Sequence, residues 1–288
     1  MGIKVLSCFD GISCGMVALE RAGIEVDKYV AYEIDESAIK ISKYNYPQIN
    51  HKGDVFNAKY VENEYDLLIG GSPCTYWSGA RLNTGKDGTV ERETEPAGLG
   101  FELFMQYVRA LKEVKPKYFL YENNFSIHVN IKNEITNILG VEPIVIDSAL
   151  VSAQQRKRCY WTNIPNITQP TDKGILFSDI INKNRDWVEN LPWSFEIWGE
   201  KRKVDTLRTI DSDKSFTVTT NRSHPRNYYL NSDRTMMSKL TADEVEILQT
   251  LPAGYTSCEK QGKRFKAIGN GWTVDVIAHI FSGLKGEF

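Results

Sequence analysis

A cysteine follows a short apolar run in the stretch LLIGGSPCTYWSG, which covers residues 67–79. Residues 67–69 have the composition of a short buried strand, and the two glycines behind them predict a turn. Pro73 fixes the backbone immediately before Cys74. Most single cysteines of this kind are inert and buried. A cysteine at a strand end can act as a nucleophile only where its neighbours favour the thiolate.

Groups that could favour a thiolate follow two other predicted strands. Glu122 comes after the apolar run KYFLY, and Arg156 and Arg158 come after PIVIDSALV. Because the carboxyl ends of parallel strands meet at one edge of a sheet, we expect these side chains to lie near Cys74. The sequence therefore predicts a thiol, a carboxyl group and two permanent cations at one sheet edge.

A second set of residues is typical of a nucleoside-binding site. The glycine turn FDGISCG follows the first predicted strand, Glu33 ends the second and Asp54 follows the third. An acidic residue about 20 positions after such a turn commonly binds ribose hydroxyls. The turn lacks GxGxxG spacing, so a nucleoside such as S-adenosylmethionine is favoured over a dinucleotide.

The order of predicted elements indicates an α/β protein. Strand and helix patterns alternate over the first 165 residues, which favours a parallel sheet covered on both faces. From about residue 166 to 234 the helical period is lost, and we expect a smaller irregular or β-rich domain. TADEVEILQTL then opens with a capping-box pattern, and WTVDVIAHIF predicts a last helix that packs on the first domain.

Composition narrows the function classes. Hydrophobic residues make up 41% of the 288 residues, and no apolar run approaches the ~18 residues of a membrane span. Five scattered cysteines and four histidines without a CxxC pair predict no metal site and reduced thiols. The net charge of −2 argues neither for nor against nucleic-acid binding, although basic residues cluster in the irregular region. We expect a soluble cytoplasmic protein.

Seven motifs together resemble the DNA cytosine-5 methyltransferase family, in the family's order along the chain. They are FDGISCG, YEID, GDVF, GGSPC, ENN, QQRKR and AIGNGWTVDV. Several stretches are especially similar to the catalytic domain of the vertebrate de novo enzymes, without the regulatory domains. The resemblance implies a Rossmann-like S-adenosylmethionine-dependent sheet, with catalytic residues 1–165 and 265–288 and a target recognition domain over 166–264. Asn124 departs from the family's Val, and Gly271 from its frequent Ser.

The resemblance also implies roles for individual residues. Cys74 would add to carbon 6 of a flipped-out cytosine, Glu122 would hold or protonate the ring, and Arg158 and Arg156 would bind the base, its phosphate or Glu122. Residues 76–88 would form the loop that carries Cys74 to the base. The expected contacts with S-adenosyl-L-methionine come from the following residues: Phe9, Asp10, Gly11, Ile12, Ser13, Glu33, Ile34, Asp54, Val55, Pro73, Asn270, Gly271 and Trp272.

Two other functions remain open at this point. The same reaction could act on RNA, since a tRNA-directed branch of the family shares these motifs. A DNA-binding homologue without catalysis is the second alternative, although the intact motifs disfavour it. The expected partner is double-stranded DNA, with a cognate restriction endonuclease as a further candidate, in a bacterial cell or encoded by a phage. The recognition sequence and the oligomeric state are not predicted.

Overall fold

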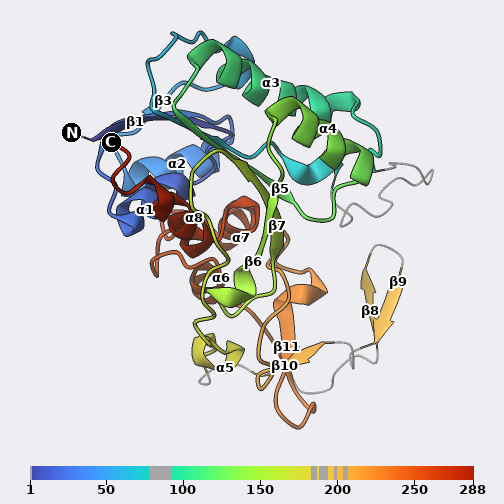
Figure 1. Cartoon of the computed structure of the whole chain (residues 1–288). Coiled ribbons are helices and arrows are strands. Elements are labelled where there is room, and N and C mark those ends of the chain that lie inside the picture. The colour runs from blue at the N-terminus through green and yellow to red at the C-terminus, as the bar shows by residue number, and fades with distance from the viewer. Residues whose placement is uncertain (1, 78–91, 183–186, 188–193, 198–199, 204–206) are drawn as a thin grey trace. The chain divides into compact units, whose positions relative to one another are not determined.

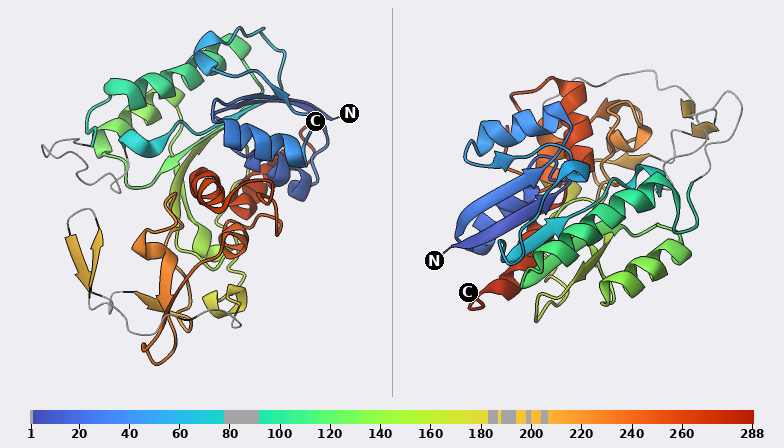
Figure 2. Two further views of the ribbon diagram at one scale, coloured as in Figure 1. Left: turned by 180° about the vertical axis from the view of Figure 1, so that it is seen from behind. Right: turned by 90° about the horizontal axis from the view of Figure 1, so that it is seen from above.

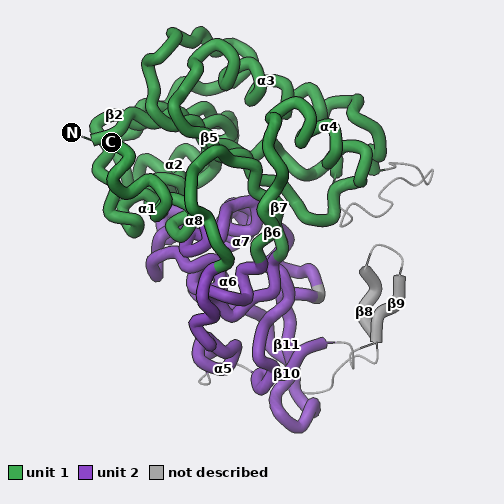
Figure 3. Tube along the Cα trace, in the orientation of Figure 1, with its two compact units in different colours: residues 1–146, 157–169, 277–288 green, residues 147–156, 170–276 purple. Residues whose placement is uncertain are grey.

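The computed structural model describes residues 2–77, 92–182, 187, 194–197, 200–203 and 207–288 (Figure 1). The chain divides into two compact units, which Figure 3 colours separately. Unit 1 consists of residues 1–146, 157–169 and 277–288, and unit 2 consists of residues 147–156 and 170–276. Within the described residues, no helix is long and apolar enough to cross a membrane.

Unit 1 is built on a seven-stranded sheet with the strand order β3-β2-β1-β4-β5-β7-β6. Its strands are β1 (Ile3–Cys8), β2 (Val26–Tyr32), β3 (Asn50–His51), β4 (Leu67–Gly70), β5 (Tyr118–Asn124), β6 (Ile144–Asp147) and β7 (Lys157–Thr162). Its helices are α1 (Cys14–Ala22), α2 (Glu36–Asn45), α3 (Gly98–Val114) and α4 (Val129–Leu139). The alternation of strands and helices predicted from the sequence is confirmed.

One strand differs from the predicted parallel sheet. β1, β2, β3, β4 and β5 pair in parallel, but β7 runs antiparallel to β5. The sequence pattern missed β7, and Arg158 therefore lies inside a strand instead of in a loop after one. Because β7 runs in the opposite direction, its first residues lie at the edge where β1, β4 and β5 end. The antiparallel strand thus still brings Arg158 to the predicted edge.

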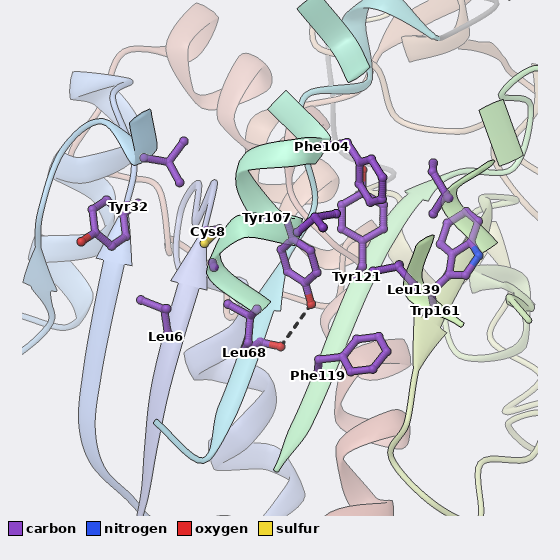
Figure 4. Close-up of a cluster of buried hydrophobic side chains, with 14 of the residues drawn as sticks. Leu6, Cys8, Tyr32, Leu68, Phe104, Tyr107, Phe119, Tyr121, Leu139 and Trp161 are labelled. Carbon is purple, nitrogen blue, oxygen red and sulfur yellow. Dashed lines mark hydrogen bonds between the residues drawn. The ribbon is translucent and has the colours of Figure 1, made fainter. Parts of the chain in front are cut away.

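The side chains of unit 1 pack in a main core on one face of the sheet. α3 and α4 cover this face, while α1 and α2 lie on the other (Figure 2). Figure 4 shows part of this core, in which Phe104 and Tyr107 of α3 pack beside Tyr121 of β5. The Tyr107 hydroxyl also donates to the carbonyl of Leu68, at 3.4 Å. Burial of these large rings holds β4 and β5 in register at the end where the predicted site lies.

Unit 2 contains short helices and small sheets, as the change in sequence pattern predicted. Its helices are α5 (Phe177–Ile180), α6 (Ala242–Leu248) and α7 (Gln261–Asn270), and α8 (Val274–Phe281) leads from unit 2 back into unit 1. β10 (Arg208–Thr209), β11 (Tyr228–Leu230) and β12 (Met237–Lys239) form one sheet, and β8 (Ser194–Ile197) pairs with β9 (Glu200–Lys203). The predicted capping box is confirmed, because Thr241 and Glu244 cap α6 reciprocally.

The compact units do not coincide with the domains predicted from the sequence. Residues 147–156 and 265–276, which the motifs assign to the catalytic domain, belong to unit 2. Packing units and functional domains follow different criteria, since a segment can pack with one and supply side chains to the other. The functional division at residues 165 and 265 therefore stays a prediction.

Candidate active site

Cys74 lies on a turn that is hydrogen-bonded to the neighbouring strand β5. The turn begins at Gly70, where a Cβ would lie 2.9 Å from the Tyr107 ring and 2.8 Å from the Cys8 carbonyl oxygen, so only glycine fits. The Ser72 hydroxyl lies 2.7 Å from the Tyr121 hydroxyl, and the Asn123 amide donates to the Ser72 carbonyl at 3.3 Å. These buried hydrogen bonds fix the backbone just before the cysteine.

The backbone after Cys74 is fixed as well. Cys74 opens a single 3-10 turn, and its carbonyl accepts from the N–H of the fully buried Trp77 at 3.0 Å. The Trp77 indole donates to Glu93 Oε2 at 2.8 Å, and the Glu93 N–H donates to the Tyr76 carbonyl. The predicted loop over residues 76–88 lies outside the described residues from position 78 onward.

Cys74 differs from most of the other cysteines in its environment. Cys8, Cys14 and Cys159 are buried, whereas Cys74 and Cys258 are partly exposed. Burial raises the pKa of the Cys8 thiol to about 12, and it also raises the pKa of Cys159. A thiol with a raised pKa carries little thiolate near neutral pH, so these two cysteines are poor nucleophiles.

Glu122 and Arg158 form an ion pair across two antiparallel strands. Asn124 of β5 lies opposite Arg158 of β7, so Glu122 and Arg158 are diagonal neighbours on one face. Arg158 Nε lies 3.1 Å from Glu122 Oε1, and the two side chains are only 14% and 12% exposed. The structure brings these two predicted residues together, and one end of the pair comes from the strand that the sequence pattern missed.

The predicted cofactor turn is held in an unusual backbone conformation. Phe9, Gly11 and Ser13 all have positive φ angles of 58° to 61°. Glu33 Oε2 accepts the Gly11 N–H at 2.8 Å, and its Oε1 accepts the N–H groups of Ile34 and Asp35 at the same distance. One carboxylate therefore joins the ends of β1 and β2 through hydrogen bonds to the backbone, and its predicted contact with ribose hydroxyls stays a prediction.

Other predicted cofactor residues have different surroundings. Asp10 points into the protein, where it accepts from the Ser13 hydroxyl at 2.5 Å and from Tyr29 at 2.7 Å. Burial raises the pKa of its carboxyl group. By contrast, Ile34 is 71% exposed beside Glu33, and its predicted contact with the cofactor stays a prediction. Ile12 is fully buried, so it supports the turn from within.

The segment after β3 has an anchor that the sequence analysis did not identify. Asp54 Oδ1 accepts the Phe56 N–H at 2.9 Å, and Val55 is buried. The Arg109 guanidinium of α3 donates to the carbonyls of Val55 at 2.7 Å and Ala58 at 3.0 Å. No sequence signal marks this anchor, because the two carbonyls that Arg109 holds are backbone atoms more than 50 positions away.

The side chain of Arg156, for which a catalytic role is predicted, is hydrogen-bonded inside unit 2. Its side chain is 5% exposed, and its guanidinium donates to the carbonyls of Val218, Gly269 and Gly271 at 3.0–3.2 Å. A cation used in this way fixes the backbone after α7 inside unit 2. The predicted contact of Arg156 with a base or phosphate stays a prediction. Within this motif, Arg156 thus bonds to backbone carbonyls, whereas the largely buried Arg158 pairs with Glu122.

The predicted cofactor residues near the end of the chain include one that contacts Arg156. Asn270 ends α7, and the Gly271 carbonyl accepts from both Arg156 and the Gln249 amide, each at 3.0 Å. Trp272 follows on the same stretch of backbone and is partly buried. The predicted contacts of Asn270, Gly271 and Trp272 with the cofactor stay a prediction. Among the described residues, no cluster of side chains could hold a metal ion.

Comparisons with known proteins agree with this fold and these motifs. The chain is similar to an orphan methyltransferase of Bacillus phage SPR, at 31% identity over 81% of this chain and 53% of that protein. It is also similar to the type II methyltransferase M.NgoPII of Neisseria gonorrhoeae, at 33% identity over 55% of this chain and 47% of that protein. The chain therefore spans about half the length of these relatives.

A solved structure and a family profile complete the comparison. The fold matches the DNMT2 structure of Spodoptera frugiperda with a TM-score of 0.70 and 14% identity, over 99% of this chain and 100% of that one. The mainly parallel seven-stranded sheet has the arrangement of the S-adenosylmethionine-dependent methyltransferase fold. The profile of the C-5 cytosine-specific DNA methylases matches residues 3–170 and 124–286, and the chain belongs to that family.

Proposed function

We propose that this protein transfers a methyl group from S-adenosylmethionine to carbon 5 of a flipped-out cytosine in duplex DNA, through a covalent adduct on Cys74. One observation carries the proposal. The turn that presents Cys74 is hydrogen-bonded to Asn123, and the neighbouring residue in β5 is Glu122, paired with Arg158. A nucleophile and a held carboxyl group thus come from adjacent strands at one sheet edge.

The covalent step makes carbon 5 reactive. The Cys74 thiolate forms a bond to carbon 6, and the electrons of the 5,6 double bond move to carbon 5 as Glu122 holds or protonates the ring nitrogen. Carbon 5 then takes the methyl group from the sulfonium of S-adenosylmethionine, which leaves as S-adenosylhomocysteine. Loss of the carbon 5 proton and cleavage of the bond to Cys74 restore the double bond and release the enzyme.

The chain's own residues support binding of S-adenosylmethionine in unit 1. The turn over residues 9–13 and the Glu33 carboxylate form one hydrogen-bonded unit, with the exposed Ile34 beside it. Asp54 lies on the next segment, which Arg109 anchors. We assign the nucleoside to this edge of unit 1, with apolar contact from Ile34.

We further propose that residues 166–264 recognise the target sequence. Flipping is required because carbon 6 is inaccessible inside a stacked duplex. Base-edge contacts in the major groove would then select the cytosine. The exposed Arg222 and Arg226 are the candidate residues for these contacts. A cognate restriction endonuclease would cut at the same recognition sequence. Plasmid DNA from cells that express this protein would then resist cleavage by that endonuclease, because its sites are methylated.

Trapping the adduct tests the chemistry without knowledge of the recognition sequence. Duplex DNA is synthesised with 5-fluorocytosine at every cytosine, so that the last elimination is blocked after methyl transfer. With S-adenosylmethionine, the wild-type protein should give a complex that survives denaturing electrophoresis, and Cys74→Ser should give none. Cys258→Ser is the matched control, because Cys258 is the other partly exposed cysteine.

The same assay separates the alternatives. An adduct with 5-fluorocytidine RNA but not with DNA would assign the reaction to RNA. Binding of S-adenosylmethionine and DNA with no adduct and no methyl transfer would indicate a non-catalytic homologue. An adduct that persists in Cys74→Ser would show that another cysteine is the nucleophile.

A further inference from the structure

Two lysines lie near an exposed aromatic ring that follows the strand of Glu122. Phe125 is 42% exposed. The Lys132 ammonium lies 4.7 Å from the centre of its ring, and the Lys157 ammonium lies 6.0 Å from it. Lys132 also donates to the Phe125 carbonyl at 3.2 Å. We call Phe125, Lys132 and Lys157 the Phe125 patch, and all three belong to unit 1.

The fold places this patch next to the candidate active site. Phe125 directly follows β5, and the side chain of Asn124 accepts from the Ser126 N–H and hydroxyl at 3.1 Å to form the turn. Lys157 begins β7 and directly precedes Arg158. The patch is therefore one residue along the chain from Arg158 and three from Glu122, at the same edge of the sheet.

The charges of the patch are not compensated within the described part of the chain. Neither Lys132 nor Lys157 forms an ion pair with a carboxylate among the described residues. The Phe125 ring attracts the two ammonium groups, but at an exposed site a cation–π contact supplies only about 0.5–1 kcal/mol. Two cations and an aromatic face together match a nucleic-acid strand, which offers phosphates to the cations and flat apolar groups to the ring.

We propose that the Phe125 patch binds the backbone of the DNA strand that contains the target cytosine, with Lys132 and Lys157 on phosphates and Phe125 against the neighbouring sugar or base. This inference rests on the proposed function, since it takes DNA as the substrate. A flipped nucleotide leaves its neighbours partly unstacked, and phosphate contacts next to it would hold the strand in register. The patch would thus strengthen binding without reading sequence.

The salt dependence of DNA binding tests this proposal directly. Each phosphate contact in B-DNA contributes about 0.9 to the slope of log K against log salt concentration. Lys132→Gln and Lys157→Gln should each lower the slope by about 0.9, and the double variant by about 1.8. The loss should be equal on target and non-target duplexes, because phosphates carry no sequence information.

Matched variants separate phosphate binding from general effects of charge. Lys4→Gln removes an exposed lysine at the start of β1, which is the opposite edge of the sheet, and should leave the slope unchanged. Phe125→Leu should weaken DNA binding and keep the slope. The melting temperature and the affinity for S-adenosylmethionine should stay at wild-type values in all five variants.

The outcomes of this experiment are distinct from those of the trapping assay. An unchanged slope in the double variant, while the wild-type protein still forms the Cys74 adduct, overturns the patch and leaves the proposed function intact. A lowered slope equal to that of Lys4→Gln also overturns it, because the effect is then one of net charge. A wild-type protein that forms no adduct with DNA refutes the proposed function itself.

Discussion

Arg158 Nε lies 3.1 Å from Glu122 Oε1, and the two residues come from antiparallel strands that pair at the carboxyl edge of the sheet. The guanidinium therefore contacts the carboxylate from a strand that begins where the other strands end. A short contact between two largely buried charged groups is sensitive to geometry, because the planar fork of arginine fixes its donors.

Arg158→Lys should keep the charge and lose this geometry. We expect kcat for methyl transfer to fall by about tenfold or more, which corresponds to ~1.4 kcal/mol of lost transition-state stabilisation. The KM for S-adenosylmethionine should stay near the wild-type value. Initial rates with labelled methyl groups measure both constants, and an unchanged kcat would show that the pair does not act in the reaction.

Arg156→Met should destabilise the protein, in contrast to Arg158→Lys. The substitution removes three hydrogen bonds from a buried guanidinium and leaves the carbonyls of Gly269 and Gly271 without that donor. We expect the free energy of unfolding to fall by about 2–5 kcal/mol, measured by urea denaturation. A fully stable but inactive Arg156→Met protein would support the catalytic role predicted from the sequence.

Gly100→Ala should disturb the support of the cysteine turn. A Cβ at Gly100 would lie 2.6 Å from both Glu93 Oε2 and the Trp77 indole nitrogen, and Trp77 is fully buried. We expect a loss of about 1–3 kcal/mol in the free energy of unfolding and slower methyl transfer. Calorimetric melting and initial rates provide the two measurements.

Gly262→Ala is the control for that substitution. Gly262 lies in α7, and nothing lies within 4 Å of the position its Cβ would occupy. The free energy of unfolding should stay the same or rise by up to about 1 kcal/mol, since alanine favours a helix over glycine. Equal destabilisation by both alanines would contradict the steric argument at Gly100.

His51 should make stability depend on pH. Ser13 Oγ lies 2.5 Å from Ser42 Oγ, which lies 3.0 Å from His51 Nε2, so the histidine ends a chain of hydroxyls from the cofactor turn. Burial, with a smaller contribution from Lys43, lowers the pKa of His51 below its ordinary value of 6.5. The unfolded chain therefore binds this proton more readily than the folded protein.

The sign of the effect follows from that difference. As the pH falls through 6.5 toward the lowered pKa of the folded state, His51 should reduce the free energy of unfolding. His51→Gln removes this titration and should give a flatter profile over the same range. Urea denaturation at several pH values compares the two proteins, and parallel profiles would rule out a contribution from His51.

The residue types and their spacing determined much of this protein before folding was considered. Strand and helix periods predicted the α/β sheet, and the motifs placed Cys74 and Glu122 at strand ends. Local signals of this kind succeed because turns, caps and apolar periods act over a few residues. The capping box at Thr241 and Glu244 is one example, since both partners lie within one helical turn.

Only the tertiary structure decided which groups the two arginines of QQRKR contact. Arg156 and Arg158 stand two positions apart, yet one is buried against the carbonyls of Val218 and Gly269 and the other pairs with Glu122. Their partners are 36 to more than 100 positions away, and two of them are backbone atoms that every residue possesses. Pairing of β7 with β5 and burial in unit 2 separate the arginines, because long-range packing decides which side of the chain faces water and which faces the core.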